Sequence, residues 1–477
     1  MTDERRWAGR RLHLIGIGGA GMSGLALVAR ALGAEVSGSD RAESPTLDRL
    51  RAAGCHVAVD HDAANVPPDA EVVHSTAVPA DNPERAVARE RGQRELHRAD
   101  LLAEITALRR CIAVTGTHGK TTTTSMVVHA LRGCGMDPGY LVGGDVRSTG
   151  ANAGWGAGEW VVVEADESDR SLLALHPDVA VLTNAELDHH ATYASQADVD
   201  DTFRAFLARA TSGVVVWDRP QLRALKPRAA AAAPDAGHDA GTVATAAPAS
   251  EHAGTVATAA AVELVAYDVP DPRLGADGVR FEWRGIPVHL RVPGAHNALN
   301  AAAALEACRL AGADPEQAVR ALADFEGAGR RFELLGTTSA GAAVYDDYAH
   351  HPTEVSATIA AARSLGARRV VALFQPHLFS RTRALARDFG RALAAADLVV
   401  VLDVYRARER PEDFPGVDGK LIADAAADAA DGRTVAWLPR FDAAERFLQA
   451  QLRAGDVLLA MGAGDVDELA RKLVHTS

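Results

Sequence analysis

Cysteine is scarce in this sequence. The 477 residues include four cysteines, which lie far apart and form no CxxC pair: Cys55, Cys111, Cys134 and Cys308. Disulfide frameworks and thiolate zinc sites both depend on characteristic cysteine spacings, so the sequence offers neither. Scattered, unpaired cysteines are typical of a reducing compartment, and we expect a cytoplasmic protein.

An excess of positive charge is also missing. Acidic residues number 63 and basic residues 50, which gives a net charge of −13. Broad, non-specific binding of nucleic acid requires an electropositive surface, so the composition argues against that class of function. We expect small-molecule substrates as partners and no nucleic acid.

A long uncharged run near the start of the chain is poorly suited to a membrane helix. Residues 12–29 contain no Asp, Glu, Lys or Arg, but five glycines occur between Gly16 and Gly24 and disfavour a helix. Asp3 and Glu4 precede the run, unlike the basic start of a secretion signal. We therefore expect no signal peptide and no membrane span.

Strands and helices alternate along most of the chain. Short apolar runs are separated by helical patterns, which predicts parallel sheets covered by helices. Because 477 residues are too many for one core, several domains are expected. We predict an α/β protein with three domains, each built on a mostly parallel sheet with flanking helices. These are a Rossmann-like domain over 1–108, a central P-loop domain over 109–326, and a second Rossmann-like domain over 327–477.

One segment of the central domain has a different composition. Alanine, threonine and glycine dominate from about residue 224 to 261, and the octapeptide AGTVATAA occurs at 240–247 and again at 253–260. Because its side chains are small, such a segment buries little apolar surface and cannot easily offset the conformational entropy lost on ordering. We predict a flexible surface insertion.

The first chemical motif is GIGGAG at residues 16–21, between a predicted strand and a predicted helix. Its glycines permit a tight turn and the close approach of a diphosphate to a helix N-terminus. Asp40 follows about 20 residues later, where its carboxylate can accept a hydrogen bond from a ribose hydroxyl. NAD fits this pattern, but so does any nucleoside diphosphate, and a turn without a ligand is the alternative.

The second motif is VTGTHGKTTTTS at residues 114–125, again between a strand and a helix. Gly116 and Gly119 leave room for backbone N–H groups to face phosphate oxygens. Lys120 supplies a cation for the β- and γ-phosphates, and the hydroxyl of Thr121 can ligate Mg²⁺. The spacing is unusual, because the first glycine lies three residues before Gly119 instead of five.

Acidic residues follow two strands of the same domain. Glu164 ends one predicted strand in VVVEADESD, and Asp188 and His189 follow another in LTNAELDHH. Carboxylate oxygens are the ligands that Mg²⁺ prefers, whereas histidine is a less usual one. Two acidic strand ends beside a phosphate loop predict a nucleotide–metal site.

These residues together resemble the Mur ligase family, and the resemblance runs through the whole chain except the alanine-rich insertion. It is carried by GIGGAGMSGLA at 16–26, GSD at 38–40, TGTHGKTTTTS at 115–125, EADESD at 164–169, PGAHNALNAAAA at 293–304, GAGRRFE at 327–333, DDYAHHPTE at 346–354, FQPHLFSRT at 374–382 and MGAGD at 461–465. The short phosphate loop is the form that this family uses.

The resemblance implies a reaction as well as a fold. The first domain would hold a UDP-sugar, the central domain Mg·ATP, and the third the amino acid. ATP would activate the carboxylate of UDP-N-acetylmuramate as an acyl phosphate, which the amine of L-alanine then attacks, in the synthesis of cell-wall precursors. Two alternatives remain: a recycling ligase that adds a preformed tripeptide, and, from another class, an NAD-dependent oxidoreductase.

The resemblance also implies roles for individual residues. The implied catalytic residues are Lys120, Glu164, His189 and Arg381, and two Mg²⁺ ions would be held by Thr121, Glu164 and His189. ATP, the co-substrate, would contact Gly116, Thr117, His118, Gly119, Lys120, Thr121, Thr122, Asn184, His296, Asn297, Asn300 and Arg330. The UDP-sugar would contact Gly18, Gly19, Ala20, Gly21, Met22, Ser39, Asp40 and Ser75. Asp346, His350, His377 and Arg381 would contact the amino acid and the phosphate group that lies next to it.

Two departures from the family pattern are informative. Several relatives carry a carbamylated lysine shortly after the DH pair, but no lysine occurs between Asn184 and Pro220 here, as in the alanine-adding branch. Leu378 stands where many of these relatives have an arginine, which leaves more of the charge neutralisation to Arg381. The base for the amine stays open among His190, His377 and Asp346, and we expect a monomer or weak homodimer.

Overall fold

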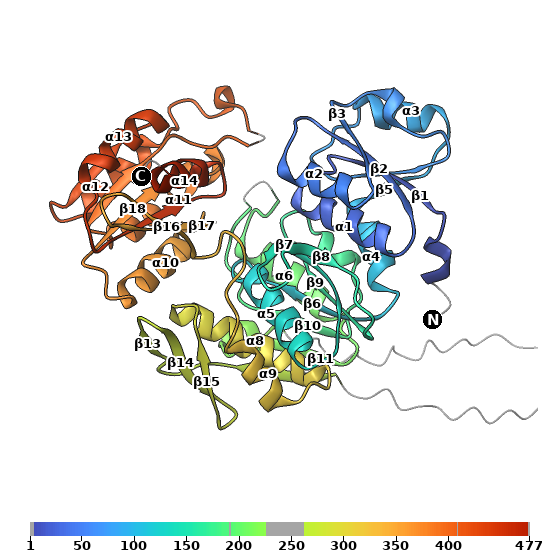
Figure 1. Cartoon of the computed structure of the whole chain (residues 1–477), viewed down its shortest axis with the longest axis horizontal. Helices are drawn as coiled ribbons and strands as arrows, with labels where there is room; N and C mark the ends of the chain where they lie inside the picture. Colours follow the sequence, from blue (N-terminus) through green and yellow to red (C-terminus); the bar gives the residue numbers. More distant parts are fainter. Residues whose placement is uncertain (1–3, 190–191, 226–261, 408, 476–477) are drawn as a thin grey trace, which may run out of the picture.

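The computed structural model describes residues 4–189, 192–225, 262–407 and 409–475. Figure 1 shows three α/β units, with the first and third above the central one and on opposite sides of it. The predicted fold class is confirmed: the sheets are mostly parallel and helices flank them. Most of the predicted insertion, residues 226–261, lies outside the described residues.

The first unit is a five-stranded parallel sheet in the order β3-β2-β1-β4-β5. Its strands are β1 (Arg11–Ile15), β2 (Glu35–Asp40), β3 (His56–Val59), β4 (Glu71–His74) and β5 (Glu95–His97). Its helices are α1 (Ala20–Ala31), α2 (Pro45–Ala52), α3 (Pro83–Glu90) and α4 (Arg98–Thr106), with 3₁₀ turns η1 (Glu4–Trp7) and η2 (Ala63–Asn65). The glycine motif forms the turn from β1 into α1.

The central unit has a seven-stranded sheet in the order β12-β11-β10-β6-β9-β7-β8, parallel except for β8. Its strands are β6 (Arg110–Thr115), β7 (Gly139–Val146), β8 (Ala151–Gly154), β9 (Trp160–Glu164), β10 (Val179–Leu182), β11 (Gly213–Trp217) and β12 (Glu263–Tyr267). The accompanying helices are α5 (Lys120–Gly133), α6 (Gln196–Leu207), α7 (Pro220–Arg223), α8 (Ala295–Leu310) and α9 (Pro315–Leu322), with the turn η3 (Ser171–Ala174). Buried alanines along α8 allow it to pack closely against α5.

A small antiparallel sheet completes the central unit. It consists of β13 (Arg273–Gly275), β14 (Gly278–Trp283) and β15 (Ile286–Leu290). The alternation of buried and exposed residues in β14 places Val279, Phe281 and Trp283 against the core.

The third unit is a six-stranded sheet in the order β16-β17-β21-β18-β19-β20, with β16 antiparallel to β17. Its strands are β16 (Glu333–Thr337), β17 (Ala343–Asp347), β18 (Arg369–Phe374), β19 (Leu398–Val401), β20 (Thr434–Trp437) and β21 (Asp456–Met461). Its helices are α10 (Pro352–Ser364), α11 (Phe379–Leu393), α12 (Lys420–Ala429), α13 (Phe441–Gln451) and α14 (Val466–His475), with the turn η4 (Pro411–Asp413).

The first two units share a hydrophobic core, whereas polar groups join the third unit to the central one. Leu25 of α1 belongs to the same buried cluster as Leu141 and Ala153 of the central sheet, and Asn152 Nδ2 donates to Ala20 O over 2.9 Å. No helix in the described ranges is long and apolar enough to cross a membrane.

Candidate active site

The phosphate loop between β6 and α5 has a backbone that only glycine adopts easily. Gly116 has φ +132° and Gly119 has φ +81°. A Cβ added at Gly116 would overlap Thr183 Oγ1, and one added at Gly119 would lie 2.5 Å from Asn300 Oδ1. Asn184 holds the loop open by accepting from His118 N at 2.9 Å. The loop is therefore shaped before any ligand arrives.

Lys120 is the first residue of helix α5 and lies on the wall of a large cavity that all three units border. Its Nζ donates to Gly116 O at 2.7 Å, to Thr117 O at 3.1 Å and to Glu167 Oε1 at 2.8 Å. Burial alone would lower the pKa of Lys120, but the charge of Glu167 raises it above its ordinary value. Lys120 is thus positively charged and is positioned beside the place where phosphate oxygens would bind.

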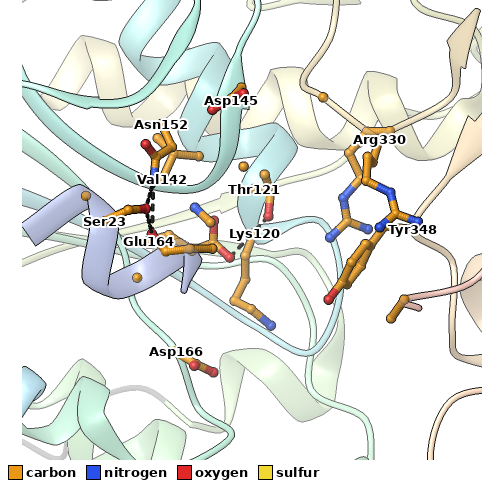
Figure 2. Close-up of a pocket in the computed structure, with 18 of the residues that line it drawn as sticks. Ser23, Lys120, Thr121, Val142, Asp145, Asn152, Glu164, Asp166, Arg330 and Tyr348 are labelled. Atoms are coloured by element: carbon orange, nitrogen blue, oxygen red, sulfur yellow. Dashed lines mark hydrogen bonds between the residues drawn. The ribbon is translucent and has the colours of Figure 1, made fainter. Parts of the chain in front are cut away.

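Glu164 ends β9 directly beside the phosphate loop. Its Oε1 accepts from Thr121 Oγ1 at 3.1 Å and its Oε2 from Gly143 N at 2.7 Å. Burial raises the pKa of this carboxyl group, although Lys120 opposes the change. Figure 2 shows Lys120 with Glu164 and Asp166, and with Arg330 and Tyr348 across the cavity. Hydroxyl and carboxylate oxygens of this kind suit Mg²⁺.

His189 enters the same acidic region from the end of the β10 loop. Its backbone has φ +53°, which is uncommon for a residue other than glycine. Its Nε2 lies 3.3 Å from Glu167 Oε1 and 3.8 Å from Asp188 Oδ2. His189 and Lys120 therefore both face Glu167.

Arg381 crosses from the third unit to the central unit. It lies in the first turn of α11, and its Nε and Nη2 donate to the two carboxylate oxygens of Asp188 at 2.9 and 3.0 Å. Both side chains are nearly fully buried. Nη1 lies 3.1 Å from His377 Nδ1, on the cavity side. Asp188 thus fixes the plane of the guanidinium group.

Arg330 is anchored within the third unit. Its Nε donates to Asp346 Oδ2 at 3.1 Å, and its Nη atoms donate to the carbonyl groups of Gly462 and Gly464. Asp346 is fully buried, and burial raises its pKa to about 6 despite the charge of Arg330. Asp346 therefore positions Arg330 and has no surface in the cavity.

The glycine turn of the first unit is held by Asp40, which accepts from Gly18 N at 2.8 Å. Successive side chains in a strand point to opposite faces, so Ser39 points away from the turn. Ser39 is fully buried, and its Oγ donates to Glu84 Oε2 at 2.6 Å. Met22 is also buried. The structure thus brings the side chain of Asp40 to the turn, whereas Ser39 contacts the turn through its backbone carbonyl, which accepts from Gly16 N at 2.8 Å.

Most of the predicted residues line one of two adjoining cavities. The larger, of about 1390 Å³, is bordered by all three units. Its walls include Gly18, Ala20, Gly21, Thr117, Gly119, Lys120, Thr121, Glu164, His189, Arg330, His350, His377 and Arg381. The smaller, of about 210 Å³, includes His118, Gly119, Thr122, Asn184, His296, Asn297 and Asn300. Neither includes Gly19, Met22, Ser39, Asp40, Ser75, Gly116 or Asp346.

The smaller cavity combines an apolar wall with polar side chains from α8. Trp217, Tyr267 and Phe325 supply the apolar part. Burial lowers the pKa of His296 to about 4, so its ring is neutral near pH 7. Asn297 and Asn300 are linked to each other by a 3.2 Å hydrogen bond. A flat, uncharged base such as adenine suits this lining.

His118 carries a charge at the junction of the central and third units. Burial alone would lower its pKa, but hydrogen bonds to Glu186 and Glu354 raise it to about 9. Both ring nitrogens lie 3.3 Å from these carboxylates. Burial and the charge of His118 lower the pKa of His351 to about 4, so only one of the two rings is protonated.

This arrangement predicts how stability depends on pH. Because the folded-state pKa of His118 exceeds its ordinary 6.5, its contribution is complete below pH 6.5 and is lost as the pH rises through 9. The difference corresponds to about 3 kcal/mol. Melting temperatures of the wild type and His118→Gln should differ most at pH 6 and converge near pH 9.5. His289→Gln, at an exposed histidine, is the control, and a constant difference would contradict the prediction.

Several groups at the site were not assigned roles from the sequence. Glu167 pairs with Lys120, Asp188 pairs with Arg381, and Glu354 pairs with His118. Glu167 and Asp188 lie within the acidic strand ends that the sequence analysis singled out, so their position was indicated but their partners were not. His190, a candidate base, lies outside the described residues.

Comparisons with known proteins agree along the chain. Three family models match: "Mur ligase family, catalytic domain" over 11–110, "Mur ligase middle domain" over 114–308 and "Mur ligase, glutamate ligase domain" over 330–464. The UDP-N-acetylmuramate–L-alanine ligase of Kineococcus radiotolerans is 48% identical, covering 98% of this chain and 96% of the relative. That of Mycobacterium sp. (strain JLS) is 44% identical, covering 98% and 94%. A crystal structure of the Thermotoga maritima UDP-N-acetylmuramate–alanine ligase has a TM-score of 0.77 at 27% identity, covering 98% of both chains.

Proposed function

The chain belongs to the Mur ligase family, and from that premise we propose that it joins L-alanine to UDP-N-acetylmuramate at the expense of ATP. The products are UDP-N-acetylmuramoyl-L-alanine, ADP and phosphate, and the reaction belongs to peptidoglycan precursor synthesis. The observation that carries the proposal is the larger cavity, in which the glycine turn, the phosphate loop and the cations of the third unit face one another.

The chemistry requires two anions, a carboxylate and a triphosphate, to approach each other. The carboxylate attacks the γ-phosphate and ADP leaves; the alanine amine then attacks the acyl phosphate, and the tetrahedral intermediate releases phosphate. Lys120 and Arg330 line opposite walls of the cavity and supply positive charge to this approach. Hydride transfer by an oxidoreductase would not require these two cations on opposite walls of the cavity.

The adjoining cavities suggest where each substrate binds. We propose that adenine occupies the smaller cavity beside His296, Asn297 and Asn300, so that the triphosphate runs over the phosphate loop into the larger one. The UDP-sugar would enter along Gly18, Ala20 and Gly21.

The third unit would receive the amino acid. His350, His377 and Arg381 line the cavity there. Of the two described groups that we considered as the base, Asp346 is buried beneath Arg330, whereas His377 faces the cavity. We therefore take His377 as the candidate acceptor of the amine proton.

The residues beside the phosphate loop fit magnesium. The Glu164 carboxylate accepts hydrogen bonds from Thr121 Oγ1 and Gly143 N at the cavity wall. We propose that Thr121 and Glu164 hold one Mg²⁺ and that Glu164 and His189 hold a second. When bound, the ions would neutralise phosphate oxygens.

Replacing Glu164 with glutamine tests this assignment. The change keeps the shape and one acceptor oxygen but removes the charge. We expect the Mg²⁺ concentration for half-maximal activity to rise by about 10- to 100-fold, measured at saturating substrates. Glu159→Gln, at an exposed residue just before the same strand, should leave the Mg²⁺ dependence unchanged. An unaltered dependence in Glu164→Gln would remove Glu164 from the metal site.

The activity itself is tested by phosphate release. ATP and UDP-N-acetylmuramate are mixed with L-alanine, L-serine, glycine or the preformed peptidoglycan tripeptide. We expect L-alanine to give the highest kcat/KM. Release that requires the tripeptide would favour the recycling ligase, and no release with any acceptor would refute the proposal. All substrates are small, and since ATP and UDP-sugars are cytoplasmic compounds, we propose a cytoplasmic enzyme that is monomeric or weakly dimeric.

A further inference from the structure

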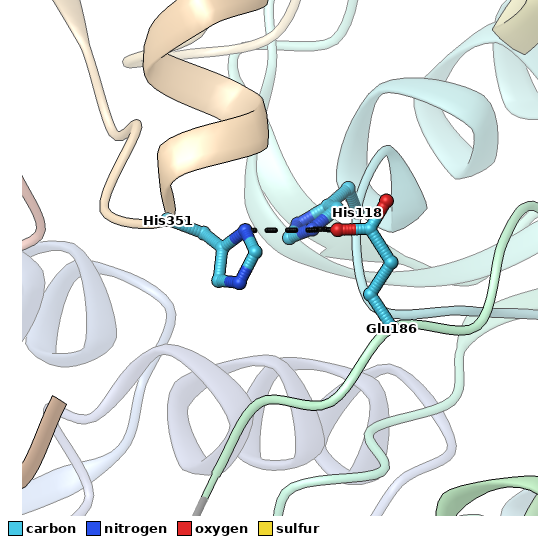
Figure 3. Close-up of side chains that lie close together, drawn as sticks. All are labelled: His118, Glu186 and His351. Atoms are coloured by element: carbon cyan, nitrogen blue, oxygen red, sulfur yellow. Dashed lines mark hydrogen bonds and ion pairs between the residues drawn. The ribbon is translucent and has the colours of Figure 1, made fainter. Parts of the chain in front are cut away.

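Three side chains that ligate metals in other proteins meet where the central and third units touch. His118 and Glu186 come from the central unit, and His351 is the N-cap residue of α10 in the third (Figure 3). One ligand atom from each lies within 4.8 Å of the others. His118 Nε2 is 3.3 Å and His351 Nδ1 is 3.8 Å from the same Glu186 oxygen. Ligands about 2.0–2.2 Å from a tetrahedral zinc ion have a similar separation, roughly 3.4 Å.

The surroundings orient these ligands as the outer shell of a metal site does. His118 Nδ1 lies 3.3 Å from Glu354 Oε1, so the nitrogen remote from the cluster faces a carboxylate, and a bound ion would replace the proton that His118 Nε2 shares with Glu186. Thr353 Oγ1 donates to Glu186 Oε2 at 2.7 Å. His351 Nδ1 accepts from Thr353 N at 3.3 Å, so this nitrogen is unprotonated, and a bound ion would take the place of that long hydrogen bond.

The cluster also has an open side. The rings of His118 and His351 are largely buried, but the side chain of Glu186 is 40% exposed. Water can therefore complete the coordination after three protein ligands are in place. Imidazole nitrogens favour zinc, cobalt or nickel over magnesium, so this group differs in kind from the oxygen-rich region around Glu164.

We propose that His118, Glu186 and His351 bind a divalent transition-metal ion, and that the bound ion clamps the third unit onto the central unit. Because the ligands come from both units, the ion is bound only where those units are apposed. Domain opening to exchange substrates and products then requires the ion to leave, so the ion acts as an inhibitor of turnover.

Cobalt binding to the full-length, nucleotide-free protein tests the site. We expect one Co²⁺ per chain with the intense visible absorption of a tetrahedral complex. His351→Asn and, separately, Glu186→Gln should weaken binding at least tenfold. His289→Asn is a matched control, because this exposed histidine also has a carboxylate neighbour, Asp277 at 3.8 Å, and it should bind Co²⁺ like the wild type.

Two further outcomes decide the matter. If His189→Asn abolishes Co²⁺ binding while His351→Asn leaves it intact, the ion occupies the region around Glu164 and the proposal is wrong. It is equally wrong if folded wild-type protein binds no Co²⁺. In the ligase assay with Mg·ATP, we expect the Zn²⁺ concentration for half-inhibition to rise at least tenfold in His351→Asn. The Co²⁺ measurement needs no turnover, so it stands apart from the proposed reaction.

Discussion

Replacing Lys120 with alanine is expected to lower the rate of phosphate release by a factor of about 10³ or more. Lys120 is the cation of the phosphate loop and lies on the cavity wall. Without it, the γ-phosphate and the attacking carboxylate would approach each other with less positive charge between them. Initial rates with ATP, UDP-N-acetylmuramate and L-alanine measure the effect.

The same change affects stability, and a second variant separates the two effects. Glu167 is nearly fully buried and has Lys120 as its partner at 2.8 Å. Removing the lysine leaves this carboxylate with only His189 beside it, at 3.3 Å, and the loss of one partner of a buried pair costs about 3–5 kcal/mol. Lys120→Ala/Glu167→Gln should therefore regain much of the lost melting temperature but none of the activity. A double variant within tenfold of the wild-type rate would exclude Lys120 from catalysis.

The sequence was most informative where a buried strand runs into a polar loop. β6, β9 and β10 are nearly continuous apolar runs, so their ends could be located, and Lys120, Thr121 and Glu164 follow from those ends. The edge strands β16 and β20 were not predicted. Their burial patterns are mixed, because one side of an edge strand has no neighbour to cover it.

Pairings between distant residues could not be predicted in the same way. Within EADESD, the choice of Glu167 as partner for Lys120 depends on the turn after β9, which periodicity does not specify. Asp188 and Arg381 are 193 residues apart, and they meet only because the third unit packs against the central unit. Ser39 is a different case: the family resemblance placed it among the UDP-sugar contacts, although strand alternation beside Asp40 directs its side chain to the other face of the sheet.

Replacing Arg381 with alanine is expected to lower kcat/KM for L-alanine by about 10²–10³-fold. Asp188 holds Nε and Nη2, which leaves Nη1 on the side of His377 and the cavity. We therefore expect Arg381 to touch the reacting groups and Asp188 to position it. Asp188→Asn keeps the guanidinium charge, so its loss should be only about tenfold.

The double variant tests this relationship. If Asp188 acts through Arg381, Asp188→Asn/Arg381→Ala should be no slower than Arg381→Ala alone, because the effects of residues acting as a unit do not add. If the fold-decrease in kcat/KM of the double variant equals the product of the two single decreases, the two residues act independently. The positioning role of Asp188 would then be wrong.

The stabilities of these variants should not follow their activities. Arg381→Ala leaves the Asp188 carboxylate buried without its arginine partner, at a cost of about 3–5 kcal/mol, whereas the double variant removes that charge. The double variant should therefore melt at a higher temperature than Arg381→Ala while being no more active. Arg369 and Asp456 form a similar pair at 2.6 Å within the third unit, and neither lines the cavities. Arg369→Ala should lower the melting temperature without changing kcat/KM, so a loss of activity there would show that the effect of Arg381→Ala comes from destabilisation of the third unit.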